Sequence, residues 1–478
     1  DAYNVAVGFY AGTAVTTGVN NTLVGAVAGD ALTTGTNNVA MGYGALGSED
    51  TGGQNVAIGV NALNTANYDG NGLNVAVGYG AGAAVSSGIQ NVLVGGLAGD
   101  ALTTGGYNVA IGGQALSAED GNGRNIAIGY SALRDQNAGA EAYNIAIGFD
   151  TGKLITTGNE NVLIGGLAGD ALTTGSMNVA VGYSALSTED GDGRNVAIGH
   201  QALQALNAGD DAYNVAVGSN AGVLMSTGIR NTILGGLAGD ALTTGGLNIA
   251  IGHQALGAED EHGRNVAIGY EALMSQNAGA DAYNVAVGFT AGVSMSTGAN
   301  NTLIGGQTGN ALTTGARNVA VGYDALGAEN AHGRNVAVGY EALKTQDAGA
   351  DAYNVAVGYQ AGLDLTSGIN CVLVGRGAGE NVTTGGTNTC VGAKAGDALT
   401  EGSNNILIGY NAAASAVDVD NEITLGDSNI ASIRCQVQTI SSLSDKRDKT
   451  NINTLDKGLD FVDALKPVKF DWETRDGS

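Results

Sequence analysis

The apolar and polar positions of this chain follow one pattern along most of its length. A pentapeptide of the form Asn-Val-Ala-Val-Gly recurs in steps of 17, 17, 17 and 19 residues, with copies that begin at Asn4, Asn21, Asn38, Asn55 and Asn74. The resulting 70-residue superrepeat continues to a degenerate last copy at Asn421, which makes 25 units. A short unit at fixed spacing predicts a solenoid, because one unit buries its apolar side chains only by stacking on its neighbours.

Each copy of the pentapeptide predicts a core-facing β-strand. Its two aliphatic residues stand two positions apart, which is the period of a strand and too short for a helix, and the regular Val/Ile pairs indicate packing. The closing Gly and the Thr-Thr-Gly of many units, such as residues 16–18, predict bends. We therefore expect flattened coils with two strands and two bends each, stacked about 4.8 Å apart. The predicted fold is an all-β, elongated, Gly-rich parallel β-roll or β-helix.

Side chains at equivalent positions form rows along such a rod. The leading Asn predicts a ladder of stacked amides. A second row follows the closing Gly and consists of Tyr43, Tyr79, Tyr130, Tyr183, Tyr270, Tyr323, Tyr340, Tyr359 and Tyr410. We interpret both rows as structural, and the stacking of sugars on exposed Tyr is the functional alternative.

The composition fits a thin fibre better than thick globular domains. The 478 residues include 81 Gly, one Pro and only 5% aromatic residues, and Gly does not recur at every third position as collagen requires. Residues 444–478 hold seven Lys/Arg and eight Asp/Glu, so the net charge of −26 leaves about −25 on the repeats. An acidic rod disfavours nucleic acid or an anionic membrane as a direct partner. No run of 18 apolar residues predicts insertion into a membrane.

Few residues suggest a metal or cofactor site. Three cysteines, Cys371, Cys390 and Cys435, lack metal-like spacing, and we interpret them as packing substitutions. The histidines also lack ligand spacing and lie scattered at His200, His253, His262 and His332. The Gly-x-Gly patterns lack the context of a dinucleotide site. We expect no cofactor, with Ca²⁺ in the acidic loops 190–193 and 259–263 as the alternative.

The character of the chain changes after the 1–420 repeat shaft. Residues 421–443 are expected to form irregular strands of a transition segment, and the composition becomes mixed and globular from Ser444. Thr454 predicts the cap of a short helix that ends before Pro467, and a strand is expected over 468–472. This small α+β segment is too short to bury a core alone. Because Asp1 stands in phase with later superrepeats, we expect the chain to be a fragment of a longer protein.

The repeats resemble the Asn-x-x-Ala-Ile-Gly-type head repeats of trimeric autotransporter adhesins, and similar repeats occur in phage tail fibres. The resemblance covers about 420 residues and implies left-handed parallel β-rolls assembled as homotrimers. The unit of 17 to 19 residues is longer than the usual unit of those adhesin heads.

The C-terminal residues carry a second resemblance. The stretch 442–452, Ser-Leu-Ser-Asp-Lys-Arg-Asp-Lys-Thr-Asn-Ile, and the stretch 465–472, Leu-Lys-Pro-Val-Lys-Phe-Asp-Trp, resemble the start of the intramolecular chaperone domain of phage tail fibres and tailspikes. That domain is classed as a self-cleaving peptidase, S74-like. The resemblance implies Ser444 as the nucleophile, Lys449 as its base and cleavage beside Ser444, which is chemically sound if burial lowers the lysine pKa. Because the later segment of the family is absent, we expect a truncated chaperone and an uncleaved chain.

These features together predict the distal shaft of a phage tail fibre, extracellular and part of the virion. A homotrimer would bind a host-surface glycan or protein through many weak sites at once and would contact other tail proteins. The C-terminal module would keep near-identical repeats in register during assembly. The alternatives are a bacterial trimeric surface adhesin, a glycan-cleaving tailspike, and an ice-binding solenoid with rows of Thr. A tailspike needs paired carboxylates in a groove, and acids such as Glu49 and Asp50 lie in repeating loops without a unique constellation.

Overall fold

The computed structural model describes residues 3–191, 193–209 and 211–434 of the chain. It forms a compact unit of residues Asp1–Ser428 and a second unit of residues Asn429–Ser478. The predictions for Cys435, Ser444, Lys449 and the small C-terminal α+β segment lie outside the described residues. Within the described ranges, no helix has the length and apolar character that crossing a membrane requires.

The first unit is a parallel β-solenoid built from 25 strands of three residues each. The strands are β1 (Val5–Val7), β2 (Thr22–Val24), β3 (Val39–Met41), β4 (Val56–Ile58), β5 (Val75–Val77), β6 (Val92–Val94), β7 (Val109–Ile111), β8 (Ile126–Ile128), β9 (Ile145–Ile147), β10 (Val162–Ile164), β11 (Val179–Val181), β12 (Val196–Ile198), β13 (Val215–Val217), β14 (Thr232–Leu234), β15 (Ile249–Ile251), β16 (Val266–Ile268), β17 (Val285–Val287), β18 (Thr302–Ile304), β19 (Val319–Val321), β20 (Val336–Val338), β21 (Val355–Val357), β22 (Val372–Val374), β23 (Thr389–Val391), β24 (Ile406–Ile408) and β25 (Ile423–Leu425).

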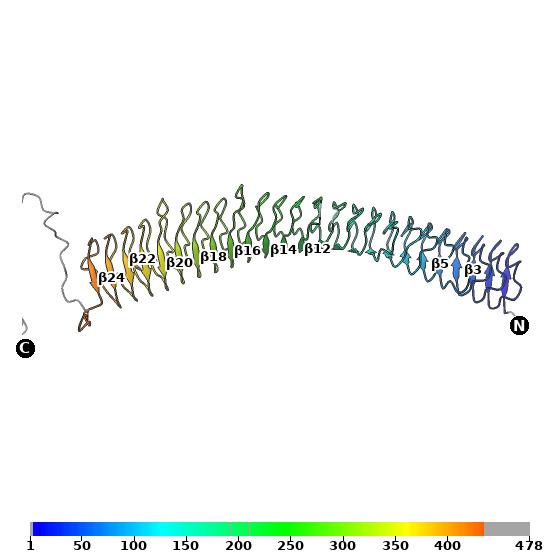
Figure 1. Cartoon of the computed structure of the whole chain (residues 1–478), viewed down its shortest axis with the longest axis horizontal. Helices are drawn as coiled ribbons and strands as arrows, with labels where there is room; N and C mark the ends of the chain where they lie inside the picture. The colour runs from blue at the N-terminus through cyan, green and yellow to red at the C-terminus, as the bar shows by residue number, and fades with distance from the viewer. Residues whose placement is uncertain (1–2, 192, 210, 435–478) are drawn as a thin grey trace, which may run out of the picture. The chain divides into compact units, whose positions relative to one another are not determined.

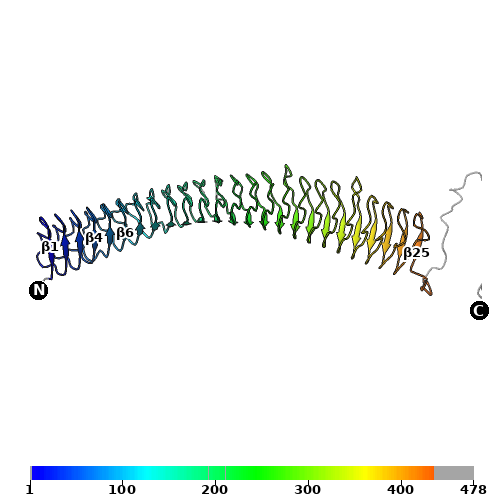
Figure 2. The ribbon, with the colours of Figure 1, turned by 180° about the vertical axis from the view of Figure 1, so that it is seen from behind.

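Each strand pairs in parallel with the strand of the next coil, in the register that the repeat dictates. Val162, for example, lies opposite Val179 and Ile164 opposite Val181. The coils follow one another in single file, and their strands line one side of the solenoid in both views (Figures 1 and 2). The last strand, β25, pairs with β24, and this unit runs to Ser428. The predicted all-β parallel solenoid is confirmed.

The prediction of two strands per coil is wrong, because each described coil has one. The rest of the coil turns repeatedly through positive φ, as at Leu167 (φ 60°) and Met177 (φ 60°) in the coil of β10. Such residues bend the backbone out of the extended conformation that a second strand needs.

The core lies behind the middle residue of each strand, not behind the flanking Val/Ile pair. In β10 the middle residue Leu163 is fully buried, whereas Val162 is half-buried and Ile164 is 38% exposed. Side chains alternate along a strand, so only the middle one of three faces inward. A Cβ at Gly169 would lie 2.7 Å from Leu172 and 3.0 Å from Leu163. The thin core therefore depends on Ala and Gly at positions that contact its leucines.

The predicted Asn ladder is confirmed and is buried. The backbone N–H of Asn161 donates to Oδ1 of Asn144 at 2.9 Å, and Nδ2 of Asn161 donates to the carbonyl of Gly175 at 2.9 Å. Cys371 takes the Asn position in its coil, and its Sγ lies 3.4 Å from the carbonyl of Gly385, where the amide would otherwise donate. Cys371 and Cys390 are both buried free cysteines, as expected for packing substitutions.

Candidate functional site

A recurring exposed feature of the solenoid is a row of aromatic side chains directly after the closing Gly of many strands. Tyr340 stacks between Tyr323 and Tyr359, with ring centroids 5.6 and 5.3 Å apart. Tyr270 stacks in the same way between His253 and Phe289, at 5.6 and 5.4 Å. Further stacked pairs are Tyr130 with Phe149 and Tyr183 with His200. These rings lie at the solenoid surface, since Tyr340 is 43% and Phe289 57% exposed.

Glycine interrupts this aromatic row in the second to fifth superrepeats. Gly166 takes the position between Phe149 and Tyr183, and Gly306 takes the position between Phe289 and Tyr323. A Cβ added at Gly306 would lie 3.5 Å from the Tyr323 ring, so the missing side chain would have continued the stack. Phe289 and Tyr323 are two coils apart, which corresponds to roughly 10 Å. A gap of one ring therefore remains between two aromatic side chains, beside the hydroxyl of Tyr323, which donates to Gln307 Oε1 at 2.6 Å.

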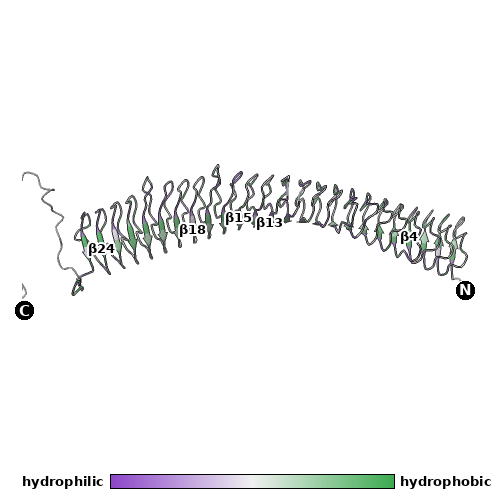
Figure 3. Ribbon diagram, in the orientation of Figure 1, coloured by the Kyte–Doolittle hydropathy of each residue, from purple (hydrophilic) through white to green (hydrophobic). Residues whose placement is uncertain are grey.

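The outer face of the sheet is apolar along the whole solenoid. The Val and Ile residues that flank the middle position of each strand lie on this face, and many are at least one-third exposed, such as Ile304 (41%) and Val357 (37%). Figure 3 shows the strong hydrophobic colour along the strands. Parallel sheets are ordinarily covered on both faces, whereas this face is uncovered in the single chain.

A buried glutamate recurs in the third coil of the first five superrepeats. These residues are Glu49, Glu119, Glu189, Glu259 and Glu329, each fully buried. They occupy the column that Leu172 and Ile155 fill in neighbouring coils. Oε1 of Glu119 accepts the backbone N–H of Asn122 at 3.1 Å, whereas its Oε2 has no partner. Burial raises the pKa of the Glu119 carboxyl above its ordinary value.

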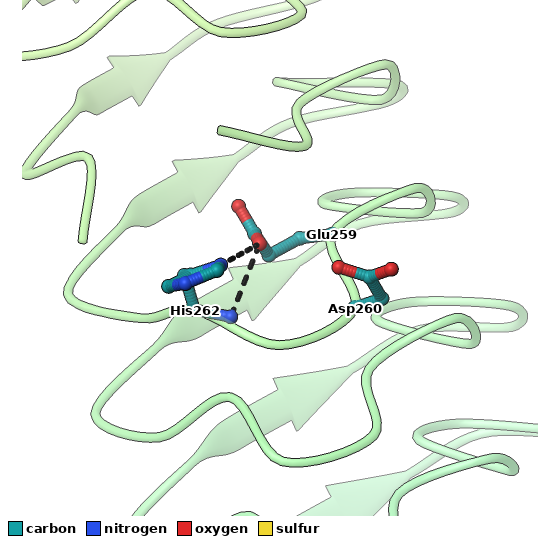
Figure 4. A group of neighbouring side chains, drawn as sticks. All are labelled: Glu259, Asp260 and His262. Atoms are coloured by element: carbon teal, nitrogen blue, oxygen red, sulfur yellow. Dashed lines mark hydrogen bonds and ion pairs between the residues drawn. The ribbon is translucent and has the colours of Figure 1, made fainter. Parts of the chain in front are cut away.

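In the fourth and fifth superrepeats a histidine joins this glutamate. Nδ1 of His262 lies 3.9 Å from Oε1 of Glu259, and the equivalent distance from His332 to Glu329 is 3.7 Å. A third ligand-type side chain is close in both places, Asp260 in the first and Asp347 in the second. Figure 4 shows the carboxylate of Glu259 and the imidazole of His262 directed toward one another. Both histidines lack ligand spacing in the sequence, and only the three-residue spacing after the repeated Glu signalled this pairing.

Arginine, tyrosine and an acid form a second recurring group on the surface. The guanidinium of Arg334 lies 5.1 Å from the ring centroid of Tyr353, and its Nη1 pairs with Asp351 at 2.8 Å. Equivalent groups are centred on Arg124, Arg194 and Arg264. Since each positive charge has an acidic partner from the next coil, these groups bridge successive coils.

Glu49 and Asp50, the acids considered for a glycan-cleaving tailspike, do not form an accessible pair of carboxylates. Glu49 is fully buried in the core and its Oε1 accepts the backbone N–H of Gly52 at 2.6 Å. A glycan on the surface could not reach this carboxyl, although Asp50 beside it is partly exposed. The Thr rows of the ice-binding alternative are also engaged, since the Thr103 hydroxyl donates to the Asp120 carbonyl at 2.8 Å.

Comparison with known proteins gives one match, at the C-terminal end. Residues 444–478 match the Peptidase_S74 family, described as the chaperone of endosialidase. No curated protein matches the chain. The endosialidase-chaperone segment begins at Ser444, the residue that the sequence resemblance names as the nucleophile. This family is a self-cleaving intramolecular chaperone, and such a segment after a β-solenoid shaft indicates a tailspike- or fibre-like protein.

Proposed function

We propose that the chain is the shaft of a phage tail fibre that attaches the virion to its host, and that its endosialidase-chaperone segment assists assembly. The observation that carries the proposal is the combination of a 25-strand solenoid, which ends at Ser428, with this segment, which begins at residue 444. Near-identical coils can pair one repeat out of register when several chains assemble, and a folding module at one end would fix that register. The roles of Ser444 and Lys449 in cleavage stay a prediction.

The proposed fibre is a homotrimer, supported by the outer face of its sheet. Val162, Ile164 and their equivalents present an apolar surface that repeats on every coil. Copies of the same chain match this surface in length and spacing, so they could cover it coil by coil. The solenoid core behind the sheet is complete in one chain, since Leu163 and the other middle residues of β2 to β24 are already buried.

Attachment is assigned to the aromatic row and its gaps. Aromatic rings bind the apolar faces of sugar rings, and the one-ring gap between Phe289 and Tyr323 offers a ring on either side. The same arrangement recurs between Phe149 and Tyr183. Because a multivalent fibre can occupy several weak sites at once, its avidity exceeds the affinity of one gap by orders of magnitude.

An array of bacterial surface glycans tests this assignment. The double variant Gly166→Tyr and Gly306→Tyr fills both gaps and should lose binding at least tenfold relative to the wild type. Gly96→Tyr is the matched control. Gly96 lies in the same row, directly after Tyr79, but the next position, Gly113, also lacks a ring, so Gly96 is not a one-ring gap between two aromatic side chains. Light scattering on each variant shows whether assembly has changed. Equal binding by wild type and double variant, with assembly intact, would remove attachment from the aromatic row.

A further inference from the structure

We propose that the third coils of the fourth and fifth superrepeats each bind one Zn²⁺ ion. One site consists of Glu259, Asp260 and His262, and the other of Glu329, His332 and Asp347. This inference is independent of the proposed attachment function.

The geometry of both groups is close to that of a zinc site. One ligand atom from each of the three side chains lies within 4.8 Å of the others. The imidazole-to-carboxylate distances are 3.9 Å at Glu259 and 3.7 Å at Glu329, too long for a hydrogen bond. Ligands that surround zinc tetrahedrally at about 2.0–2.1 Å lie roughly 3.4 Å apart. Small rotations of side chains would therefore bring these atoms to ligand distance.

Unpartnered buried atoms are the second observation that points to an ion. Nδ1 of His262 and Oε2 of Glu259 are both inaccessible to solvent and have no hydrogen-bond partner, and the same holds for His332 and Glu329. The Glu259 side chain is completely buried. Leaving a buried polar atom without a partner is energetically unfavourable. A cation bound between the imidazole and the carboxylate would give Nδ1 a partner, and it would engage Oε2 if the carboxylate bound it through both oxygens. Because Oε2 is equally unpartnered in Glu49 and Glu119, the imidazole nitrogen is the atom that distinguishes these two turns.

Other superrepeats of the same chain show that the histidine is an addition to the common turn. The residue three positions after the buried Glu is Gly52 in the first superrepeat and Asn122 in the second. Both donate a backbone N–H to the glutamate, as His262 and His332 do. The fold of this turn therefore does not require an imidazole.

The ligand types favour zinc over calcium. Calcium takes six to eight oxygen ligands, whereas each group here offers one imidazole nitrogen and two carboxylates. One nitrogen and two oxygens with a position left for water suit Zn²⁺. The third ligand comes from different places in the two sites, because Asp260 belongs to the same turn as Glu259 and Asp347 belongs to the coil that follows Glu329.

Counting bound zinc in the whole chain tests the proposal. Metal-free protein is titrated with Zn²⁺ by calorimetry, and the zinc that remains after gel filtration is measured by mass spectrometry. The wild type should retain two ions per chain, His262→Asn and His332→Asn one each, and the double variant none. Asn stands at the equivalent position 122, so these variants keep a side chain that the turn already accommodates. Their circular dichroism should match that of the wild type.

The matched control is Glu119→Gln, which alters the equivalent buried glutamate in a turn without histidine and should leave the count at two. Excess Ca²⁺ should not displace the zinc. A wild type that retains no zinc would overturn the proposal. So would a count that is unchanged in the double histidine variant or that falls in the Glu119→Gln control.

Discussion

The side-chain oxygen of Asn161 accepts the backbone N–H of Asn178, one coil further along, at 3.0 Å. The amide of the same side chain donates to Gly175. One side chain thus connects successive coils at a buried position where water cannot replace it. This explains why Asn leads nearly every repeat although it has a low preference for strands.

Replacing Asn161 with Ala should open the solenoid locally. The N–H of Asn178 and the carbonyl of Gly175 would both lose their partner, at about 1–3 kcal/mol for each buried group. Hydrogen exchange of the Asn178 amide should accelerate by at least tenfold. Asn161→Cys is the control, because Cys371 occupies this position naturally with Sγ near the Gly385 carbonyl, and it should retain more protection. Unchanged exchange in Asn161→Ala would contradict the role of the ladder.

Two adjacent glycines should differ in how much the same substitution destabilises the chain. Gly95 has φ +140°, and a Cβ there would lie 2.4 Å from the carbonyl oxygen of Gly112. Gly96 has no neighbouring atom within 4 Å of its Cβ position. We expect Gly95→Ala to lower the unfolding free energy by about 3 kcal/mol or more, from backbone strain and the clash together. Gly96→Ala should change it little. Thermal unfolding compares the two, and similar losses in both would refute the steric argument.

The repeat itself made much of the fold predictable. The spacing of the pentapeptides determines the coil, and the identical residues at each position determine the parallel register, as Val162 opposite Val179 shows. The inward face was not predictable in the same way. A three-residue strand has one residue on one face and two on the other, and the pentapeptide alone does not show which face is inside. The burial of Leu163 and the exposure of Ile164 settle it.

The candidate sites were harder to predict, because they depend on residues that lie in different coils. The aromatic row was visible in the sequence as Tyr after the closing Gly, but His253 and Phe289 belong to the same stack and were not assigned to it. The acid at Glu259 looked like part of a solvated loop, because charged residues surround it. Its burial follows from its equivalence to Leu172, which fills the same core column in another coil. That equivalence is seen only when coils are compared with one another, not when neighbouring residues in the sequence are compared.

The buried glutamates should make the solenoid more stable in acid than at neutral pH. Burial raises the pKa of Glu119 in the folded chain above its value in the unfolded chain. The protonated form is therefore favoured by folding, and this contribution is fully present below the unfolded pKa and is lost as pH rises through the folded pKa. Glu119→Gln removes the titration, so the variant should be more stable than the wild type at pH 8 and similar to it at pH 4.

Melting temperatures at the two pH values check this prediction. Glu160→Gln is the control, because the Glu160 side chain is exposed, and it should keep the wild-type difference between pH 4 and pH 8. A Glu119→Gln variant whose pH difference equals that of the wild type would show that this carboxyl does not titrate on unfolding.

The apolar outer face of the sheet leads to the last prediction, which concerns assembly. Ile164 and Ile304 are 38% and 41% exposed in the single chain, and in the proposed trimer other copies would cover them. Lysine at either position would place a charge in that contact, whereas neither side chain contributes to the core behind the sheet.

Light scattering should give the mass of three chains for the wild type and a lower mass for the Ile164→Lys, Ile304→Lys double variant at micromolar concentration. Thr174→Lys, on an exposed turn, should remain trimeric. Since the coil core is untouched, the double variant should keep its β-sheet circular dichroism. A wild type with the mass of a single chain would refute the trimer, and would leave the apolar sheet face to a different partner.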